Sequence, residues 1–319
     1  MSGSNDHIGA EARRYGTATI GEAVKRLRAG SLVAVPTETV YGLAADSTNT
    51  DAVAEIYRTK GRPDFNPLIV HVPDLSAANK LGDFGNLAVQ FAQAFWPGPL
   101  TLVVPKAANC SATAAVTAGL DTIAIRCPVH PVMRELLAES GMVLAAPSAN
   151  RSGGISPTTA DHVARSLGDQ APLILDGGPC ERGLESTIVA IDDSNYRILR
   201  PGPVTPMQLE KVAGKPSVTS STGKIESPGQ LASHYSPSKP LRLNATAAEP
   251  DEYLIGFGLI AGDWNLSPQA DIAEAASHLF AALHDADASE GLKIAVAPVP
   301  DDGIGLALND RLRRAASPE

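Results

Sequence analysis

The sequence predicts an α/β protein in which helices cover a mixed sheet and a smaller α/β unit follows. Three observations support this prediction. Segments with helical periodicity alternate with short apolar runs, which is the order of elements in α/β folds. Most of these runs, such as residues 67–72, show no alternation of apolar and polar residues, as expected for strands buried on both faces. Between residues 173 and 202, three strand-like runs follow one another without a helix, which indicates an antiparallel portion.

The elements of the larger unit follow from apolar spacing and from capping residues. Residues 19–30 repeat apolar residues at helical spacing, and Gly30 lies at the C-terminal cap position. Residues 49–63 predict a second helix, with Asn49 or Thr50 as its N-cap and basic residues at its end. Further helices are predicted over 86–95, 130–140, 159–167 and 205–214. Strands are predicted over 31–36, 67–72, 100–105, 122–127, 142–147, 173–178, 186–191 and 196–202.

A linker separates this unit from a second one. Residues 215–240 are rich in Ser, Thr, Pro and Gly and lack apolar periodicity. Beyond them, a strand, a long helix, a strand and a final helix predict a small α/β unit. Its sequence GFGLIAG follows a strand as a dinucleotide-binding loop does, but the third glycine is one position late, which favours a tight turn. The predicted boundaries are 1–16 for an N-terminal tail, 17–214 for the large domain, 215–240 for the linker and 241–319 for the C-terminal domain.

Composition excludes several classes of function. The 319 residues carry a formal net charge of −9, which argues against a protein that coats nucleic acid or a membrane through bulk charge. Aromatic residues make up 4% of the chain, so few platforms exist for base stacking. Cys110, Cys127 and Cys180 are far apart and match no zinc or disulfide spacing, as is typical of the reducing cytoplasm. The start of the chain does not resemble a signal peptide, and no apolar run reaches membrane length, so we expect a cytoplasmic protein.

A basic cluster at Arg58, Lys60 and Arg62 is unusual in such an acidic chain. These cations could simply complement the dipole at the end of a helix. However, a glycine and a proline fix an irregular backbone within the cluster, and Asn66 adds an amide donor just before the next strand. Rigid cations beside an amide are suited to a triphosphate, because guanidinium groups bind phosphate oxygens in pairs and lysine supplies a point charge. We therefore interpret this cluster as a phosphate site.

Polar side chains also gather where predicted strands end. Ligands of open α/β sheets bind outside the carboxyl ends of the strands, although these hydroxyls could instead tie up loop amides. Arg126 and Arg200 lie at strand ends, where a buried arginine is costly unless it is paired or faces a ligand. No P-loop, serine elbow, metal-binding helix motif or reactive thiol stands out, so the chemistry should depend on positioning and charge neutralisation. The hydroxyl and amide groups are Thr37, Thr39, Tyr41, Ser148, Asn150, Ser152, Ser156, Ser186 and Thr187.

Five sequence blocks together resemble a known family. They are PTETVYGL (36–43), KGRPDFNPLIVHV (60–72), APSANRSGGISPT (146–158), GLESTIVAI (183–191) and LRPG (199–202). Their order and spacing resemble the signature of the YrdC/Sua5 family, the threonylcarbamoyl-AMP synthases, over roughly residues 17–205. The linker SPGQLASHYSPSKPL and the ending GIGLALNDRLRRAA are similar to those of the long Sua5 type. The resemblance implies a YrdC-like twisted, mixed, open sheet followed by a small Rossmann-like C-terminal domain.

The resemblance also implies an activity. Family members are nucleotidyltransferases (EC 2.7.7.87) that convert ATP, L-threonine and bicarbonate to threonylcarbamoyl-AMP, pyrophosphate and water. Mg²⁺ is expected to accompany ATP. The product feeds a separate tRNA threonylcarbamoyl transferase complex that makes N6-threonylcarbamoyladenosine, so no direct, stable nucleic-acid binding is expected. The linker is expected to close over the nucleotide as a lid, which would protect a mixed anhydride from water.

Site residues are carried over from the matching motifs. Lys60 and Arg62 correspond to the catalytic Lys-x-Arg pair of the family. His71 would count as an ordinary core histidine without the resemblance. The implied ATP-binding residues are Arg62, Asn66, Thr122, Ser148, Asn150, Ser156, Arg200 and either His234 or Tyr235. The implied L-threonine-binding residues are Thr39, His71, Arg126, Ala146 (through its backbone) and Ser186. No protein side chain is identified as a metal ligand.

Two alternative functions remain at the level of the sequence. The first is an RNA-binding or ribosome-associated module without turnover, which the net charge and the few aromatic residues disfavour. The second is a related maturation protein that uses carbamoyl phosphate, but such proteins carry zinc-finger and acylphosphatase-like regions that this sequence lacks. Release of pyrophosphate from ATP that depends on threonine and bicarbonate would distinguish the enzyme from both.

Overall fold

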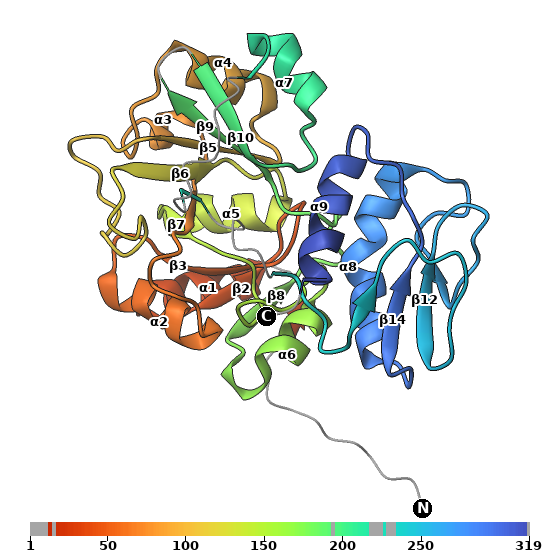
Figure 1. Cartoon of the computed structure of the whole chain (residues 1–319). Helices are drawn as coiled ribbons and strands as arrows, with labels where there is room; N and C mark the ends of the chain where they lie inside the picture. The colour runs from red at the N-terminus through yellow and green to blue at the C-terminus, as the bar shows by residue number, and fades with distance from the viewer. Residues whose placement is uncertain (1–11, 15–16, 193–194, 217–225, 228–233, 318–319) are drawn as a thin grey trace, which may run out of the picture.

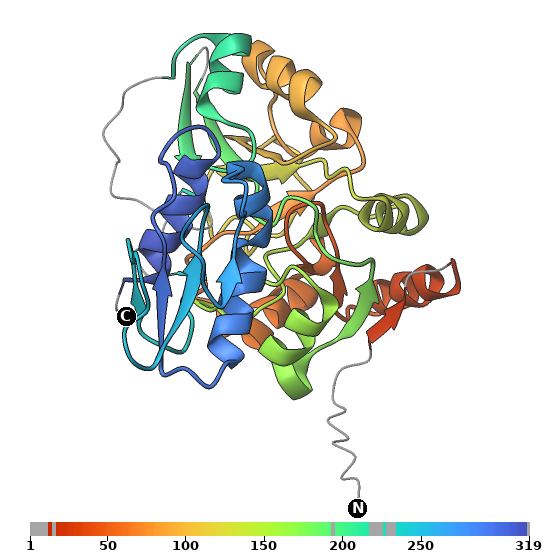
Figure 2. The same ribbon diagram turned by 90° about the vertical axis from the view of Figure 1, so that its right-hand side faces the viewer.

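The computed structural model describes residues 12–14, 17–192, 195–216, 226–227 and 234–317. Figure 1 shows a large mixed sheet with helices on both sides and, beside it, a smaller unit whose helices α8 and α9 lie between its own sheet and the large domain. In the view of Figure 2 the small unit is in front, with its strands outermost. The two α/β units predicted from the sequence are thus present and packed together. None of the helices in the described ranges is long and apolar enough to span a bilayer.

The large sheet has ten strands in the order β1-β8-β2-β3-β7-β4-β6-β5-β9-β10. It is mixed, with parallel pairs such as β4–β6 and antiparallel pairs such as β5–β6. The strands are β1 Ala12–Arg14, β2 Val33–Val35, β3 Gly42–Asp46, β4 Ile69–His71, β5 Leu100–Pro105, β6 Thr122–Arg126, β7 Leu144–Ala145, β8 Leu173–Asp176, β9 Thr187–Asp192 and β10 Asn195–Arg200. The predicted mixed sheet is therefore confirmed.

The antiparallel portion differs in part from its prediction. Strands β9 and β10 form an antiparallel pair, as expected from their succession. Strand β8, however, lies at the other end of the sheet, where it pairs in parallel with β1 and β2. The chain crosses the sheet between β8 and β9, and β9 joins β5 in parallel. Succession in the sequence thus predicted the β9–β10 pair but not the position of β8.

The helices cover the sheet through alternating side chains. On one face, Val33 and Val35 of β2 pack with α1 and α5, whereas Ala34 between them faces the cluster that contains α2, α4, α6 and α7. This alternation is the period of two expected for a strand. The helices are α1 Thr17–Arg28, α2 Thr50–Lys60, α3 Leu75–Ala78, α4 Asn86–Phe95, α5 Pro131–Ser140, α6 Ala160–Leu167, the 3₁₀ turn η1 Gly168–Gln170 and α7 Pro206–Ala213. Every helix predicted in this domain is confirmed, with bounds that shift by a few residues at most.

The C-terminal unit is a parallel sheet in the order β11-β14-β12-β13 with two helices. The parallel strands and helical crossover confirm its predicted Rossmann-like character. The GFGLIAG segment turns tightly from β12 into β13, with a bridge between Phe257 and Ile260, so the prediction of a turn is confirmed. The elements are β11 Leu241–Arg242, β12 Glu252–Gly256, β13 Trp264–Asn265, α8 Ile272–Ala288, β14 Lys293–Val296 and α9 Gly305–Ala315.

Candidate active site

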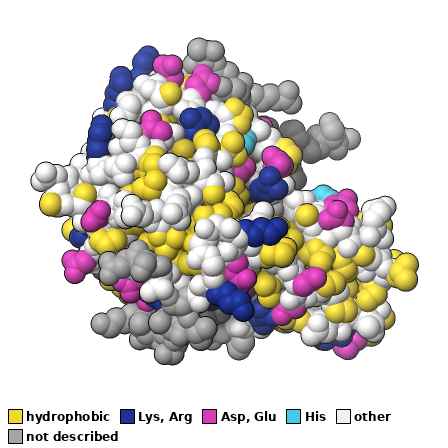
Figure 3. Space-filling view, turned by 90° about the horizontal axis from the view of Figure 1, so that it is seen from above, with side chains coloured by type: hydrophobic (Ala, Val, Ile, Leu, Met, Phe, Trp, Pro, Cys, Tyr) yellow, Lys and Arg dark blue, Asp and Glu magenta, His cyan; other side chains and the backbone are white. Residues whose placement is uncertain are grey.

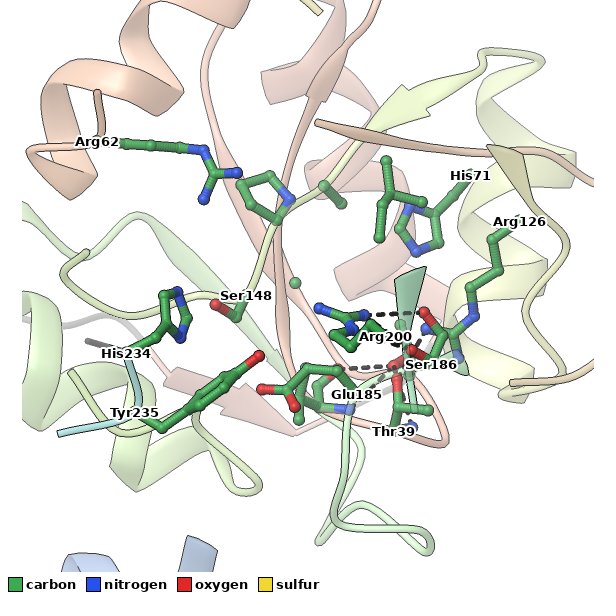
Figure 4. A pocket seen from close by; sticks show the side chains of 16 residues that line it. Thr39, Arg62, His71, Arg126, Ser148, Glu185, Ser186, Arg200, His234 and Tyr235 are labelled. Carbon is green, nitrogen blue, oxygen red and sulfur yellow. Dashed lines mark hydrogen bonds between the residues drawn. The ribbon is translucent and has the colours of Figure 1, made fainter. Parts of the chain in front are cut away.

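A pocket forms where the loop after β2, the end of α2, strands β4 and β6 and the loops around β7 and β9 converge (Figure 4). It brings together residues from all five sequence blocks and from the linker. Its lining is Thr37, Thr39, Val40, Gly42, Arg62, Ile69, His71, Arg126, Ala146, Pro147, Ser148, Glu185, Ser186, Arg200, His234 and Tyr235. Ten of the residues implied by the family resemblance belong to it, namely Thr39, Arg62, His71, Arg126, Ala146, Ser148, Ser186, Arg200, His234 and Tyr235.

One end of the pocket is built around Arg126, the last residue of β6. Its Nη1 donates a hydrogen bond to Thr39 Oγ1 at 2.8 Å, and its Nε donates to the Gly98 carbonyl at 3.3 Å. His71, paired with Arg126 across β4 and β6, is buried, and its Nδ1 has no hydrogen-bond partner among the described residues. Burial, with the nearby charge of Arg126, lowers the pKa of His71 to about 3. This imidazole is therefore neutral near pH 7 and has an unsatisfied nitrogen beside a guanidinium.

The Arg126 end contains an acid that the sequence did not single out. Glu38 Oε1 accepts from Arg126 Nη2 at 2.6 Å, and both side chains are buried. Burial alone would raise the pKa of Glu38, but the charge and hydrogen bond of Arg126 outweigh it and hold the pKa below its ordinary value. Glu38 lies between two hydroxyl residues of the PTETVYGL block. Nothing near it in the sequence indicates which base it would pair with. The pair spans 88 residues.

Arg62 lies across the pocket from Arg126, and Arg200 lies beside Ser186 (Figure 4). The Arg62 guanidinium points into the pocket in Figure 4, where its Nε and Nη2 donate to the carbonyls of Asn66 and Pro67 at 3.0 and 2.7 Å. Burial lowers the pKa of Arg62 to about 10, so it remains charged at neutral pH. Arg200, at the end of β10, donates to the Ser186 carbonyl through Nε and Nη2 at 3.1 and 3.0 Å. Two buried guanidinium groups thus flank the same space.

Lys60 has a different position from that expected for a direct phosphate ligand. Its side chain is buried behind the pocket wall, and Nζ donates to the carbonyls of Ser148 and Asn150 at 2.6 and 2.5 Å. Burial, and then the neighbouring charge of Arg62, lowers the pKa of Lys60 well below its ordinary value. Lys60 therefore holds the loop after β7, whose Ser148 lines the pocket.

Four further residues implied by the resemblance lie beside the pocket lining. Asn150 accepts a short hydrogen bond of 2.5 Å from Ser148 Oγ, and Ser156 Oγ donates to the Glu185 carboxylate. The buried amide of Asn66 has no hydrogen-bond partner for either of its atoms among the described residues. Thr122 begins β6, four residues before Arg126, which places it about 13 Å away along the strand. By the β4–β6 register it belongs to the Arg62 end, next to Pro67.

The C-terminal domain supports the pocket from behind, through a residue that holds Glu185 of its lining. Arg311 of α9 is fully buried, and its Nε donates to Glu185 Oε2 at 2.9 Å. Burial would lower the pKa of Arg311, but Tyr235 and Glu185 raise it above its ordinary value. The guanidinium carbon also lies 5.3 Å from the centroid of the Tyr235 ring. Neither Glu185 nor Arg311 was predicted, because their contact joins residues 126 positions apart in different domains.

His234 and Tyr235 close one side of the pocket, with ring centroids 4.0 Å apart (Figure 4). Both side chains are buried, and among the described residues His234 Nδ1 and the Tyr235 hydroxyl have no hydrogen-bond partner. As bounded here, the pocket has a free volume of about 50 Å³, whereas pockets for nucleotide-sized ligands have about 300–1,000 Å³. A ligand of that size therefore does not fit the pocket in this closed arrangement.

The site suits an anionic, strongly hydrogen-bonding ligand. Buried polar atoms without partners are rare in folded proteins, and several of those found here border one pocket. Three buried guanidinium groups, from Arg62, Arg126 and Arg200, face the same space. No group of three or more His, Cys, Asp or Glu side chains in the described part of the chain is placed to hold a metal ion.

Comparison with known proteins assigns both domains. The sequence profile of the Sua5/YciO/YrdC family, described as "telomere recombination", matches residues 25–202. A second profile, the threonylcarbamoyl-AMP synthase C-terminal domain, matches residues 204–317. The threonylcarbamoyl-AMP synthase of Bacillus subtilis is 40% identical over 321 residues, which cover 93% of this chain and 92% of the relative. That of Pyrococcus abyssi is 36% identical, covering 91% and 92%.

Solved structures agree with the sequence matches. The crystal structure of P. abyssi Sua5 complexed with L-threonine has a TM-score of 0.87 and 34% sequence identity, and the match covers 96% of this chain and 97% of that one. This likeness extends over both domains and includes the YrdC-like mixed sheet that the sequence resemblance implied. From these matches, the chain belongs to the YrdC/Sua5 family, in its long Sua5 form with a C-terminal domain.

Proposed function

We propose that this protein is an L-threonylcarbamoyladenylate synthase, a nucleotidyltransferase of class EC 2.7.7.87. It converts L-threonine, bicarbonate and ATP to threonylcarbamoyl-AMP, pyrophosphate and water. The observation that carries this proposal is a buried pocket lined by three guanidinium groups: Arg126 beside Thr39, Arg200 beside Ser186, and Arg62 across from them. The names of the B. subtilis and P. abyssi relatives support it, as does the threonine complex of the P. abyssi protein.

The two ends of the pocket would divide the substrates. Arg126, Thr39 and Ser186 provide donors for the carboxylate and hydroxyl of threonine, beside the unpaired nitrogen of His71. The threonine amine attacks bicarbonate, and loss of water gives a carbamate. A carbamate oxygen then attacks the α-phosphorus of ATP, and the bond to the departing pyrophosphate breaks. Arg62 and Arg200 would neutralise the charge of the transferring phosphoryl group, and no protein nucleophile takes part.

Several further partners belong to this proposal. Mg²⁺ would arrive with ATP, bound to its phosphate oxygens, which neutralises charge without a dedicated protein cage. The product would pass to a tRNA threonylcarbamoyl transferase complex in the cytoplasm. On the face seen in Figure 3, Lys and Arg side chains are interspersed with Asp and Glu. That distribution supports an enzyme with a local anion pocket over the alternative of a non-catalytic RNA-binding module.

The linker is proposed to act as a lid. Residues 217–225 and 228–233 of the predicted linker lie outside the described part of the chain, so the hypothesis concerns mainly its end. There, His234 and Tyr235 already lie over the pocket, and their unpaired Nδ1 and hydroxyl are available to a nucleotide. This arrangement supports a segment that moves away to admit substrates and then closes over them.

The test is release of pyrophosphate from ATP by the purified protein with Mg²⁺. We expect release that requires both L-threonine and bicarbonate, together with a product whose mass equals that of threonylcarbamoyl-AMP. Omission of threonine, or its replacement by D-threonine, provides the control. A folded protein that binds ATP but shows no threonine-dependent release would contradict the proposed function and favour the binding module.

A further inference from the structure

Glu38 has a buried carboxylate directly behind the Arg126 end of the pocket. One oxygen accepts from Arg126 Nη2 at 2.6 Å, and the other accepts from the backbone N–H of Val129 at 3.2 Å. The Glu38 carbonyl in turn accepts from the backbone N–H of Arg182 at 2.8 Å. Glu38 does not line the pocket. It is instead fixed from both sides by the loops that follow β6 and β8.

The Arg126 guanidinium, which Glu38 helps to hold, uses some of its donors within the protein and leaves others free. A guanidinium has five N–H donors in a planar fork. Three of them are used, by Gly98, Thr39 and Glu38, with one bond each from Nε, Nη1 and Nη2. Within the described residues, one N–H therefore remains on each terminal nitrogen, and these two donors are free to bind the oxygens of a carboxylate.

Glu38 also balances the charge of Arg126. A buried guanidinium is stable only with a partner, and Glu38 is the acid paired with Arg126 among the described residues. Glu185, the other buried acid of this region, is paired with Arg311 instead. Without Glu38, the Arg126 side chain would lose both its counter-charge and one of its three anchors, and it could turn towards other acceptors.

We infer that Glu38 is a positioning residue for the amino-acid substrate: it holds the Arg126 fork in the orientation that receives the α-carboxylate of L-threonine. This inference rests on the proposed function. Because Glu38 acts through Arg126 at one end of the pocket, its loss should weaken use of threonine and leave use of ATP nearly unchanged. A merely structural role would affect both substrates or only the amount of folded protein.

The experiment compares Glu38→Gln with the wild-type full-length chain. Pyrophosphate release is measured against L-threonine at saturating ATP and bicarbonate, and against ATP at saturating threonine. We expect Glu38→Gln to raise the KM for L-threonine at least tenfold while the KM for ATP changes less than twofold. Glu38→Asp keeps the charge but is shorter by one methylene, so its KM for threonine should rise less than that of Glu38→Gln.

Glu252→Gln is the matched control. Glu252 also accepts from one arginine, Arg242, and from one backbone N–H, that of Glu249, but it lies in the C-terminal sheet. We expect both of its KM values to equal those of the wild type. Thermal unfolding shows whether each variant is folded. If Glu38→Gln does not fold, the two KM values of Glu38→Asp are compared with those of the wild type instead.

The outcomes separate the inference from the proposed function. Equal rises in both KM values, an unchanged KM for threonine, or a larger effect of Asp than of Gln would overturn the positioning role while wild-type activity upholds the synthase. Absence of threonine-dependent release by the wild-type protein would overturn the proposed function and this inference with it. Titration calorimetry of L-threonine should show the same order of affinities, wild type above Asp above Gln.

Discussion

At the scale of single residues, Arg58, Lys60 and Arg62 are neighbours in the sequence but have three different environments. The Arg58 side chain is 70% exposed and pairs with Glu55 one helical turn earlier. Lys60 is buried against two loop carbonyls, and Arg62 points into the pocket. Water screens the charge of Arg58, whereas the charge of Arg62 acts in a desolvated space. The three residues of the basic cluster therefore have three separate roles.

This difference predicts that two substitutions at the same helix end affect the KM for ATP differently. Arg62→Ala removes a charged donor from the pocket, and such a bond to a buried anion is worth about 1.5–3 kcal/mol. We expect the KM for ATP to rise by roughly ten- to a hundredfold. Arg58→Ala removes an exposed cation and should leave the KM for ATP within twofold. Steady-state release of pyrophosphate measures both, and similar values for the two variants would contradict the assignment of Arg62.

The candidate site was predictable as far as its residues carry a local or family signal. Arg126 and Arg200 were identified because arginines at the ends of buried strands need a reason to be there. Glu38 and Glu185 were not identified, since a buried acid is explained only by the base that it meets. Those bases, Arg126 and Arg311, are 88 and 126 residues away in the sequence.

At the scale of elements, periodicity predicted the helices of eight or more residues and most of the strands, but it missed the short helix α3 and the strands β1, β3, β11 and β13. Strand β3 consists of Gly42–Asp46, whose small residues have low strand propensity, and pairing with β2 and β7 on either side decides its conformation. Strand β1 lies within residues 1–16, predicted as a tail, and joins the sheet edge beside β8. Both strands are set by tertiary pairing, which a local pattern does not record.

A contact between α6 and α8 predicts an acid sensitivity. His162 and His284 stack with ring centroids 3.9 Å apart. Burial, followed by the charge of the other ring, lowers the pKa of His162 to about 3, and burial lowers that of His284 to about 4. Nearby, Arg165 also lowers both pKa values, whereas Asp287 raises that of His284. Both rings are thus neutral in the folded protein at pH values where they are protonated in the unfolded chain.

The sign of the effect follows from proton binding. Between about pH 6.5 and pH 4 the unfolded chain binds protons that the folded chain excludes. The contribution of these two histidines to stability is therefore fully present above pH 6.5 and is lost as the pH falls. Each such histidine contributes a slope of up to about 1.4 kcal/mol per pH unit. His162→Gln should therefore reduce the loss of stability between pH 7 and pH 5, as measured by urea unfolding. Parallel pH profiles for the variant and the wild type would contradict this prediction.

At the scale of the whole molecule, the two domains share an apolar cluster at their boundary. Val40, Ile155 and Leu184 from the large domain pack with Tyr235 and with the apolar side chains of α8 and α9. The buried Arg311–Glu185 pair lies at the same boundary. An apolar interface with a buried ion pair favours a fixed arrangement over freely moving domains. The sequence predicted both units, but not this shared surface, because its residues come from distant parts of the chain.

Gly183 offers a direct test of whether this fixed arrangement matters for the pocket. Gly183 and Gly178 both have left-handed backbone, with φ of +64° and +83°, so alanine at either position costs roughly 1–2 kcal/mol of conformational strain. A Cβ at Gly183 would overlap the backbone carbonyl of Ser277 on α8, whereas one at Gly178 would meet no described atom within 4 Å. Gly178→Ala is therefore the matched control for strain alone.

We expect Gly183→Ala to lower the free energy of unfolding by roughly 2 kcal/mol more than Gly178→Ala does, because a close-packed interface tolerates an added methyl group poorly. We also expect a reduced kcat/KM only for Gly183→Ala, since α8 must shift and the same domain carries Arg311, which pairs with Glu185 of the pocket lining. Denaturant unfolding and pyrophosphate release measure the two effects. Equal losses in both variants would mean that the added methyl group does not disturb the domain interface and that strain alone explains the changes.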